Sequence, residues 1–165
     1  MPATRNDLFQ RFDHLGIEST THDHEAVYTV AESDAIDRRL PGGHTKNLFL
    51  KDAKGRIFLI IAESHAQVNL KTIHKEIGCA RLSFGKPDLL MEVLGVEPGA
   101  VTALGVINDR DKRLEQVIVD QDLMAFDVIN CHPLENTATT TIARDDLIRF
   151  IRDCGHEPRI MPLNT

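Results

Sequence analysis

The feature that most constrains the fold of this chain is a pair of apolar runs separated by a short turn. The runs cover residues 46–51 and 56–62, and the intervening Asp52-Ala53-Lys54-Gly55 ends in glycine. Strands joined by so few residues pair antiparallel, and glycine tolerates the positive φ that tight turns use. The sequence therefore predicts a β-hairpin against which the other elements must pack.

The other periodic segments do not alternate regularly between helix and strand. Apolar residues at helical spacing, with proline or a capping box at the start or glycine at the end, predict helices, and short apolar or β-branched runs predict strands. The predicted helices cover residues 4–15, 29–38 (with a capping box at Thr29 and Glu32), 69–77, 87–94 and 145–154; further strands cover 20–24, 103–107, 116–120, 126–130 and 137–142; and 158–162 is a docked or loose tail. We expect one α+β domain over residues 1–165, with a mixed, curved, barrel-like sheet flanked by helices rather than a doubly wound sheet.

Size and composition fit that expectation. The chain has 165 residues, of which 42% are hydrophobic, enough for one core. No stretch approaches the ~20 apolar residues that span a bilayer, and the charged N-terminus lacks the apolar region of a signal peptide. We therefore expect a soluble, cytoplasmic protein without membrane contact.

The charge balance limits nucleic-acid binding. The net charge is −6, from 25 acidic residues against 19 lysines and arginines. A duplex-DNA binder gains most of its affinity from a basic surface, so this class is disfavoured. Any contact with nucleic acid must be local, and the candidate cations are Arg38, Arg39, Lys46, Lys51, Lys54, Arg56, Lys71, Lys75 and Arg81.

Cysteine and histidine spacing gives no indication of a metal or a disulfide framework. Cys79, Cys131 and Cys154 are odd in number and lack a Cys-x-x-Cys pair, so we expect reduced thiols, with Cys131 in the core. His22 and His24 would share a strand face, but no third ligand follows at a standard spacing. We expect neither a metal nor another cofactor.

Three separated segments have the residue types that bind an anionic ligand. They are Thr45-Lys46-Asn47, the turn-rich stretch 95–109 with three glycines, and Cys131-His132-Pro133 with Asn136. Glycine lets backbone N–H groups approach a ligand closely, lysine supplies a compact cation, and histidine both donates and accepts. We predict that these segments meet around one substrate.

The same segments carry a resemblance to a known family. Residues 43–50, the Gly99-Ala100-Val101-Thr102-Ala103 loop leading to Asn108-Asp109, and residues 132–136 through Thr139-Thr140 resemble the YbaK/ProX family of prolyl-tRNA synthetase editing domains and free-standing relatives. Residues 24–29 also resemble an early family motif, with Glu25 and Ala26 in place of prolines. Ala103 stands where the family's glycine loop commonly has proline, which removes a fixed φ. The arrangement is most similar to free-standing deacylases that remove alanine from tRNA(Pro).

The resemblance implies a trans-editing hydrolase that cleaves the ester bond of mischarged aminoacyl-tRNA. Such an ester is already activated, so the protein must mainly position it and stabilise the developing oxyanion. The chain has no Gly-x-Ser-x-Gly elbow and needs no triad. The expected catalytic residues are Lys46, Asn47 and His132, and the expected substrate-binding residues are His24, Val27, Tyr28, Thr29, Gly99, Ala100, Val101, Thr102 and Ala103; Val30 and Ile36 are further candidates for the pocket wall.

Several alternatives remain open at the level of sequence. Lys46 is also consistent with a solvated strand-end lysine, and His132 with a residue packed on the sheet. The chain is also compatible with a deacylase for cysteine or serine, a non-catalytic tRNA-binding module, or an amino-acid sensor. The implied partner is the acceptor end of aminoacyl-tRNA, foremost tRNA(Pro), with prolyl-tRNA synthetase or an elongation factor as a further contact.

Overall fold

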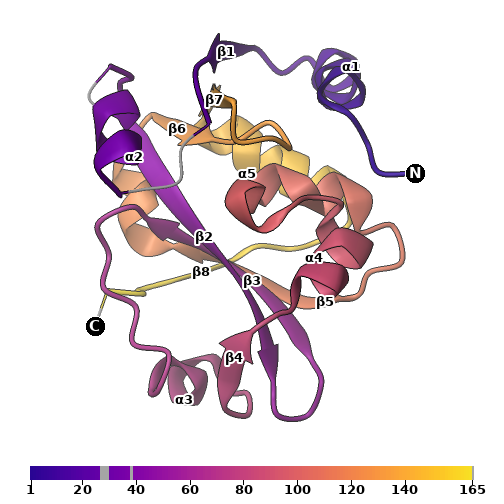
Figure 1. Cartoon of the computed structure of the whole chain (residues 1–165), viewed down its shortest axis with the longest axis vertical. Coiled ribbons are helices and arrows are strands. Elements are labelled where there is room, and N and C mark those ends of the chain that lie inside the picture. The colour runs from indigo at the N-terminus through magenta and orange to yellow at the C-terminus, as the bar shows by residue number, and fades with distance from the viewer. Residues whose placement is uncertain (27–29, 38, 165) are drawn as a thin grey trace.

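A mixed sheet of eight strands organises the part of the chain that the computed structural model describes, residues 1–26, 30–37 and 39–164 (Figure 1). The strands are β1 Ser19–Asp23, β2 Gly43–Asp52, β3 Ile57–Glu63, β4 Leu82–Phe84, β5 Leu114–Asp120, β6 Val128–Cys131, β7 Ala138–Ala143 and β8 Arg159–Met161. The α-helices are α1 Arg5–Leu15, α2 Val30–Asp37, α3 Ile73–Ile77, α4 Pro87–Leu94 and α5 Arg144–Asp153, and 3₁₀ turns cover η1 Pro98–Ala100, η2 Ala103–Asn108 and η3 Gln121–Ala125. Among these residues no helix reaches the length and apolar character that crossing a bilayer requires.

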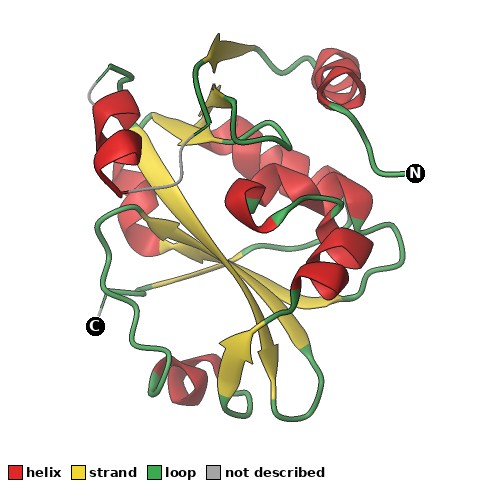
Figure 2. Ribbon diagram, viewed as in Figure 1, coloured by secondary structure: helices red, strands yellow, loops and turns green. Residues whose placement is uncertain are grey.

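The long strand β2 holds the sheet together. It pairs antiparallel with β3 from Thr45 to Lys51, which confirms the predicted hairpin. On its other side, Gly43 and His44 pair parallel with β6, whereas residues 50–52 pair antiparallel with β4. The strand order is β1-β7-β6-β2-β3-β5-β8, with β4 on β2. The sheet is mixed and curved, as predicted, but it stays open, with β1 and β8 at its edges, and does not close into a barrel (Figure 2).

Alternate side chains of the central strands pack into two hydrophobic cores. One core contains Leu59 and Ile61 of β3 and is covered by α1, α4 and α5; within it the rings of Phe12 and Phe150 meet edge to face at 5.3 Å. The smaller core contains Phe58 and Ile60 and is covered by α3 and the C-terminal segment. Because β3 is buried on both faces, it reads as a continuous apolar run.

Several predicted elements are confirmed. The first helix begins with a capping box, since the Thr4 hydroxyl accepts from Asp7 N–H and the Asp7 carboxylate from Thr4 N–H, and it ends at Gly16 with φ +70°. The helix at 87–94 has proline in its first turn and Gly95 at φ +66° behind it. The three described cysteines are free, and Cys131 is buried. The predicted capping box at Thr29 lies outside the described residues.

Other expectations were wrong. Residues 103–107 form not a strand but the 3₁₀ turn η2, because the Thr102 side chain accepts from Leu104 N–H and starts a helical turn whose apolar residues are all buried against α4 and α5. The helix expected from residue 69 begins only at Ile73, since residues 69–72 form turns in which Asn69 accepts from Lys71 N–H at 3.0 Å. Strand β4 was missed, and the tail contains β8, which extends the sheet beside β5.

Candidate active site

A small recess lies where β2 begins, β6 ends and α2 covers both. Its cavity volume is about 30 Å³, roughly the space of one or two water molecules. Residues from five separate elements or turns line it: His24, Ile36, Asp37, His44, Thr45, Asn130, Cys131, His132 and Thr139. The first and third segments singled out in the sequence therefore meet here, together with the strand β7.

His132 is held in one orientation at the wall of this recess. Its Nδ1 lies 2.8 Å from the carbonyl oxygen of Ala138, which can only accept, so Nδ1 carries the proton. Burial, together with the neighbouring His24 ring at 6.5 Å, lowers the pKa of His132 below its usual range. The ring is therefore neutral at pH 7, and Nε2 has a lone pair that can accept a proton or a hydrogen bond.

His24 is fixed by a similar pattern. Its Nδ1 lies 2.7 Å from the carbonyl oxygen of Glu25, and its Nε2 lies 2.8 Å from the hydroxyl of Thr139. The carbonyl makes Nδ1 the donor, so Nε2 accepts from the hydroxyl when the ring is neutral. Two oriented imidazoles thus share one wall of the recess.

His44 lies opposite, with each of its ring nitrogens next to a hydrogen-bond acceptor. Its Nδ1 contacts the Asp37 carboxylate at 2.9 Å, and its Nε2 contacts the Leu40 carbonyl oxygen at 3.0 Å. Both neighbours are acceptors, so both ring nitrogens must carry protons to satisfy them. Burial would lower the pKa of His44, but the hydrogen bonds to Asp37 and Leu40 outweigh it and raise the pKa above its ordinary value.

Asn130 is a structural residue of the site that the sequence reasoning missed. Its buried amide donates to the carbonyl oxygens of Pro41 and Gly43 at 2.8 and 3.1 Å, and its Oδ1 accepts from Thr141 at 2.5 Å. It thereby clamps the turn between α2 and β2 onto β6. A lone amide inside the apolar run Val128–Cys131 was the available signal, because a buried amide must find partners.

The glycine loop adjoins the recess through Thr102. The hydroxyl of this buried residue donates to the carbonyl oxygen of His132 at 2.7 Å. Residues 95–100 and 134–136 line a neighbouring groove of about 280 Å³, so the second and third segments also meet.

Leu134, at the turn between β6 and β7, has φ +72°, a conformation that is uncommon for leucine. The backbone N–H of Ala100, one of the predicted substrate-binding residues of the glycine loop, donates instead to the carbonyl oxygen of Glu97 at 2.9 Å. Ala103 is fully buried.

Lys46 and Asn47 lie beside the recess but do not line it. As neighbours in β2 they point to opposite faces of the sheet. Lys46 shares the face of Ala62, with which it pairs, and its ammonium donates to the carbonyl oxygen of Ala66. Asn47 shares the face of Ile61, toward the core that contains the glycine loop, and its buried Oδ1 has no hydrogen-bond partner among the described residues.

The remaining predicted residues give less information. Val27, Tyr28 and Thr29 lie outside the described residues, so their place at the pocket wall stays a prediction. Within residues 1–26, 30–37 and 39–164 no group of three or more His, Cys, Asp or Glu is arranged to hold a metal ion. Burial raises the pKa of the Cys131 thiol to about 12, so Cys131 is not a nucleophile.

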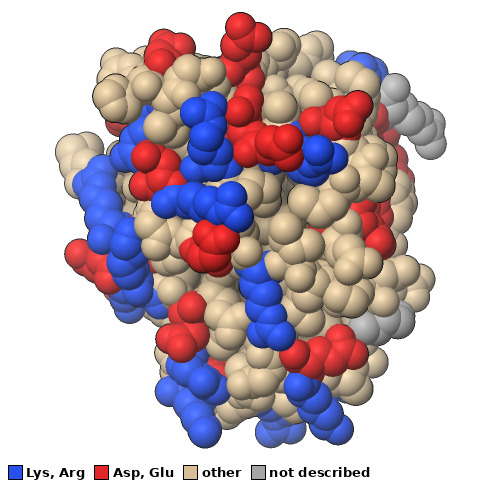
Figure 3. Space-filling model, turned by 180° about the vertical axis from the view of Figure 1, so that it is seen from behind, with Lys and Arg blue, Asp and Glu red and all other residues tan. Residues whose placement is uncertain are grey.

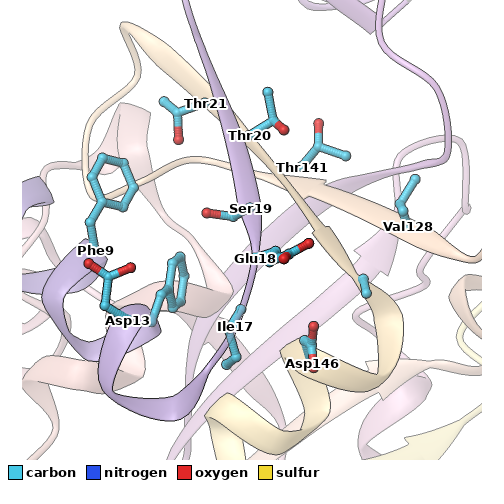
Figure 4. Close-up of a pocket in the computed structure, with 12 residues that line it drawn as sticks. Phe9, Asp13, Ile17, Glu18, Ser19, Thr20, Thr21, Val128, Thr141 and Asp146 are labelled. Atoms are coloured by element: carbon cyan, nitrogen blue, oxygen red, sulfur yellow. The ribbon is translucent and has the colours of Figure 1, made fainter.

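A larger hollow of about 800 Å³ lies between α1, β1 and α5 (Figure 4). Phe9 and Asp13 of α1 face Ser19 to Thr21 of β1 across it, and Asp146 of α5 lies below. Among the described residues that line it, those with a charge are Asp13, Glu18 and Asp146. Carboxylates repel phosphate, so this hollow is a poor site for a nucleic acid, and none of the predicted site residues that the structure describes lines it.

Surface charge agrees with a local contact to an anion. On the face behind that of Figure 1, lysines and arginines are interspersed with acidic side chains rather than gathered into one continuous basic surface (Figure 3). The charge is nevertheless distributed unevenly along the sequence, since residues 51–86 have seven lysines and arginines against three acids. One of those acids, Asp52, is buried.

Comparison with known proteins places this geometry in context. Residues 24–150 match the model of the aminoacyl-tRNA editing domain. The chain is 36% identical over 150 residues to the prolyl-tRNA editing protein ProX of Acetoanaerobium sticklandii, covering 90% of this chain and 91% of that protein. It is 35% identical over 159 residues to the prolyl-tRNA synthetase associated domain-containing protein 1 of Danio rerio, covering 95% and 86%. A crystal structure provisionally described as a trans-editing enzyme for prolyl-tRNA synthetase superposes with a TM-score of 0.73 at 16% identity, covering 100% of this chain and 99% of the other.

Proposed function

This chain belongs to the aminoacyl-tRNA editing domain family, and on that premise we propose that it hydrolyses mischarged aminoacyl-tRNA in trans, with alanyl-tRNA(Pro) as its main substrate. Residues 1–165 then act as one editing unit. The observation that carries the proposal is the orientation of His132, whose protonated Nδ1 is bonded to Ala138 and whose lone pair at Nε2 is adjacent to a recess of small volume.

The reaction needs positioning more than an activated nucleophile. Water adds to the ester carbonyl carbon, the carbonyl oxygen becomes an oxyanion, and the bond to the ribose oxygen then breaks, with a proton passing to that oxygen. His132 Nε2 orients the water or the adjacent ribose hydroxyl by accepting its hydrogen bond. Lys46 and the N–H groups of Gly99 and Val101 bind the terminal phosphate or the carbonyl oxygen, and Asn47 binds the ribose. The products are a free amino acid and uncharged tRNA.

The volume of the recess supports alanine as the amino acid removed. A space of about 30 Å³ suits a methyl side chain. An apolar pocket discriminates a single methylene by only ~1–3 kcal/mol, so larger side chains are excluded by steric clash with the wall. Serine and cysteine differ from alanine by one heavy atom and are the closest competitors.

The distribution of charge supports RNA as the partner. The surplus of four cations in residues 51–86 contrasts with a surplus of ten acids in the rest of the chain. We propose that this basic segment contacts phosphates of the acceptor end of tRNA(Pro). The reaction then takes place in the cytoplasm, where aminoacyl-tRNA forms. Prolyl-tRNA synthetase or an elongation factor delivers the aminoacyl-tRNA to this protein. The KM for aminoacyl-tRNA should then rise steeply with salt concentration, and a KM that is unchanged by salt would contradict this contact.

Deacylation of tRNA(Pro) carrying alanine, serine, cysteine or proline tests the function directly. We expect alanine to be released fastest and proline to be retained. Faster release of serine or cysteine would keep the enzyme class and correct the pocket. If none of the four is released above the rate without protein, the catalytic proposal fails, and the tRNA-binding module or amino-acid sensor takes its place. Alanine on a different tRNA tests the choice of tRNA.

The pH dependence of the rate tests His132. Because the neutral ring is the active form and its pKa is lowered, the rate corrected for spontaneous hydrolysis should rise with pH, with a midpoint below the ordinary pKa of histidine. His132→Gln should remove this acidic limb and lower kcat/KM about a hundredfold. His24→Gln serves as the comparison, since it removes the other imidazole of the same wall. An unchanged pH profile in His132→Gln would reject the role.

A further inference from the structure

The C-terminal end of helix α2 lies at the recess, where its residues Ile36 and Asp37 are part of the lining. Among its residues with described side chains none is fully buried: Asp34, Ile36 and Asp37 are half-buried, and Ala31, Glu32 and Ala35 are exposed. Amphipathic helices are usually held by a buried apolar stripe, which the described part of α2 lacks. Yet Ile36 and Asp37 form one side of the recess. Polar contacts at the end of α2 therefore help to set the position of this wall.

Two polar contacts at the end of α2 meet at one imidazole, that of His44. His44 joins the Asp37 carboxylate, at the last residue of α2, and the Leu40 carbonyl oxygen, in the bend that follows. Its backbone is itself fixed, because His44 pairs with Asn130 of β6 and its carbonyl oxygen accepts from Ser64 N–H at 2.8 Å. The side chain of His44, a residue fixed in β2, therefore forms hydrogen bonds to two positions at the end of α2.

We propose that His44 and Asp37 fasten the end of α2 to β2 and so set the width of the recess, which makes them specificity-determining residues for the reaction proposed above. The role rests on the proposed function, because width matters only if an acyl group enters the recess. Neither residue needs to touch the reacting atoms, so both are positioning residues. When the contacts of His44 with Asp37 and Leu40 are removed, kcat/KM for amino acids larger than alanine should rise relative to that for alanine.

The fastening requires a doubly protonated ring. A neutral imidazole donates from one nitrogen only, so one of the two contacts is lost when His44 loses its proton. The charged groups facing it in the described structure are Asp37 of α2 and Glu63 of β3, which both favour the proton, with the cation of Lys46 two residues along β2. The pKa is raised, so the fastening is complete below the ordinary pKa of histidine and is lost as pH rises through the folded value.

Two measurements test the proposal. The first is imidazole NMR titration with amide hydrogen exchange, without substrate: Asp37→Asn should lower the pKa of His44, and His44→Gln should accelerate exchange in α2 at the same pH.

The second is the ratio of kcat/KM for alanyl-tRNA(Pro) to that for seryl- and prolyl-tRNA(Pro). In wild type the ratio should fall as pH rises through the pKa of His44. In His44→Gln and Asp37→Asn it should be about tenfold lower at pH 6 and insensitive to this titration, with little change in thermal midpoint.

His65→Gln is the matched control, because this histidine also contacts a carboxylate, Glu63 at 3.2 Å, yet its side chain is 75% exposed and it is not among the described residues that line the recess. The ratio of kcat/KM for alanyl-tRNA(Pro) to that for seryl- and prolyl-tRNA(Pro) should be unchanged in His65→Gln. A wild-type ratio in His44→Gln, measured on an active enzyme, would overturn the inference and leave the proposed function intact. If wild type releases no amino acid, the proposed function fails and the selective role of His44 fails with it, whereas the NMR result separately reports whether the fastening exists.

Discussion

Replacing Lys46 by alanine should lower the rate of aminoacyl-tRNA deacylation by about a hundredfold or more while leaving the protein folded. The Lys46 ammonium donates to the Ala66 carbonyl oxygen at the edge of the site, which leaves two of its three protons for a phosphate or a carbonyl oxygen of the substrate. A cation that binds the terminal phosphate should mainly affect KM, whereas one that binds the developing oxyanion should mainly affect kcat. Steady-state kinetics on alanyl-tRNA(Pro) separates these two roles.

Lys112→Ala is the matched control for this loss. Lys112 also donates its ammonium to a backbone carbonyl oxygen, that of Cys154 at 2.9 Å, but it lies in the turn before β5, outside the recess and the adjoining groove. We expect deacylation in this variant to remain near the wild-type rate. Wild-type turnover in a folded Lys46→Ala protein would show that Lys46 is a solvated strand lysine without a catalytic role.

Replacing Asp52 by alanine should cause a large loss of stability. The Asp52 side chain is 0% exposed, and its carboxylate accepts from the N–H groups of Lys54, Arg56 and Ala80 and from Arg56 Nε, at 2.9–3.2 Å. These bonds close the β2–β3 hairpin and hold the segment before β4 against it. Their loss should cost about 3 kcal/mol or more, and the thermal midpoint should fall by roughly 6–12 °C.

Acid should weaken the same contact. Burial opposes the charge of Asp52, but the hydrogen bonds from Arg56, Ala80 and Lys54 outweigh it and lower its pKa. A carboxylate with a lowered pKa stabilises the fold above its unfolded pKa, and this contribution is lost as pH falls through the folded value. Thermal unfolding of wild type and Asp52→Ala should therefore converge at acidic pH. Asp111→Ala, an exposed acid in the turn before β5, should unfold like wild type at each pH. Equal midpoints for Asp52→Ala and wild type at neutral pH would contradict the assigned role.

The sequence predicted best those elements whose signals are local. The hairpin, the helix at 87–94 and the glycines that end helices were correct because spacing, proline and positive φ act within a few residues. The segment at 103–107 failed for the opposite reason. Its apolar run is equally compatible with a buried strand or a buried turn, and packing against α4 and α5, together with the Thr102 cap, selected the turn.

The candidate site shows the same division. Spacing and resemblance selected Lys46, Asn47 and His132 as candidates, and the alternation of strand side chains could already have shown that Lys46 and Asn47 face opposite sides of the sheet. The contacts of His44 with Asp37 and of Asn130 with Pro41 were not readable from the sequence.

By itself the sequence determined the local elements, the family and the residue types available for the chemistry. The tertiary structure alone decided which of these residues meet, because the parallel register of β2 with β6 brings together segments more than 80 residues apart. That register depends on the packing of the whole sheet rather than on any local signal.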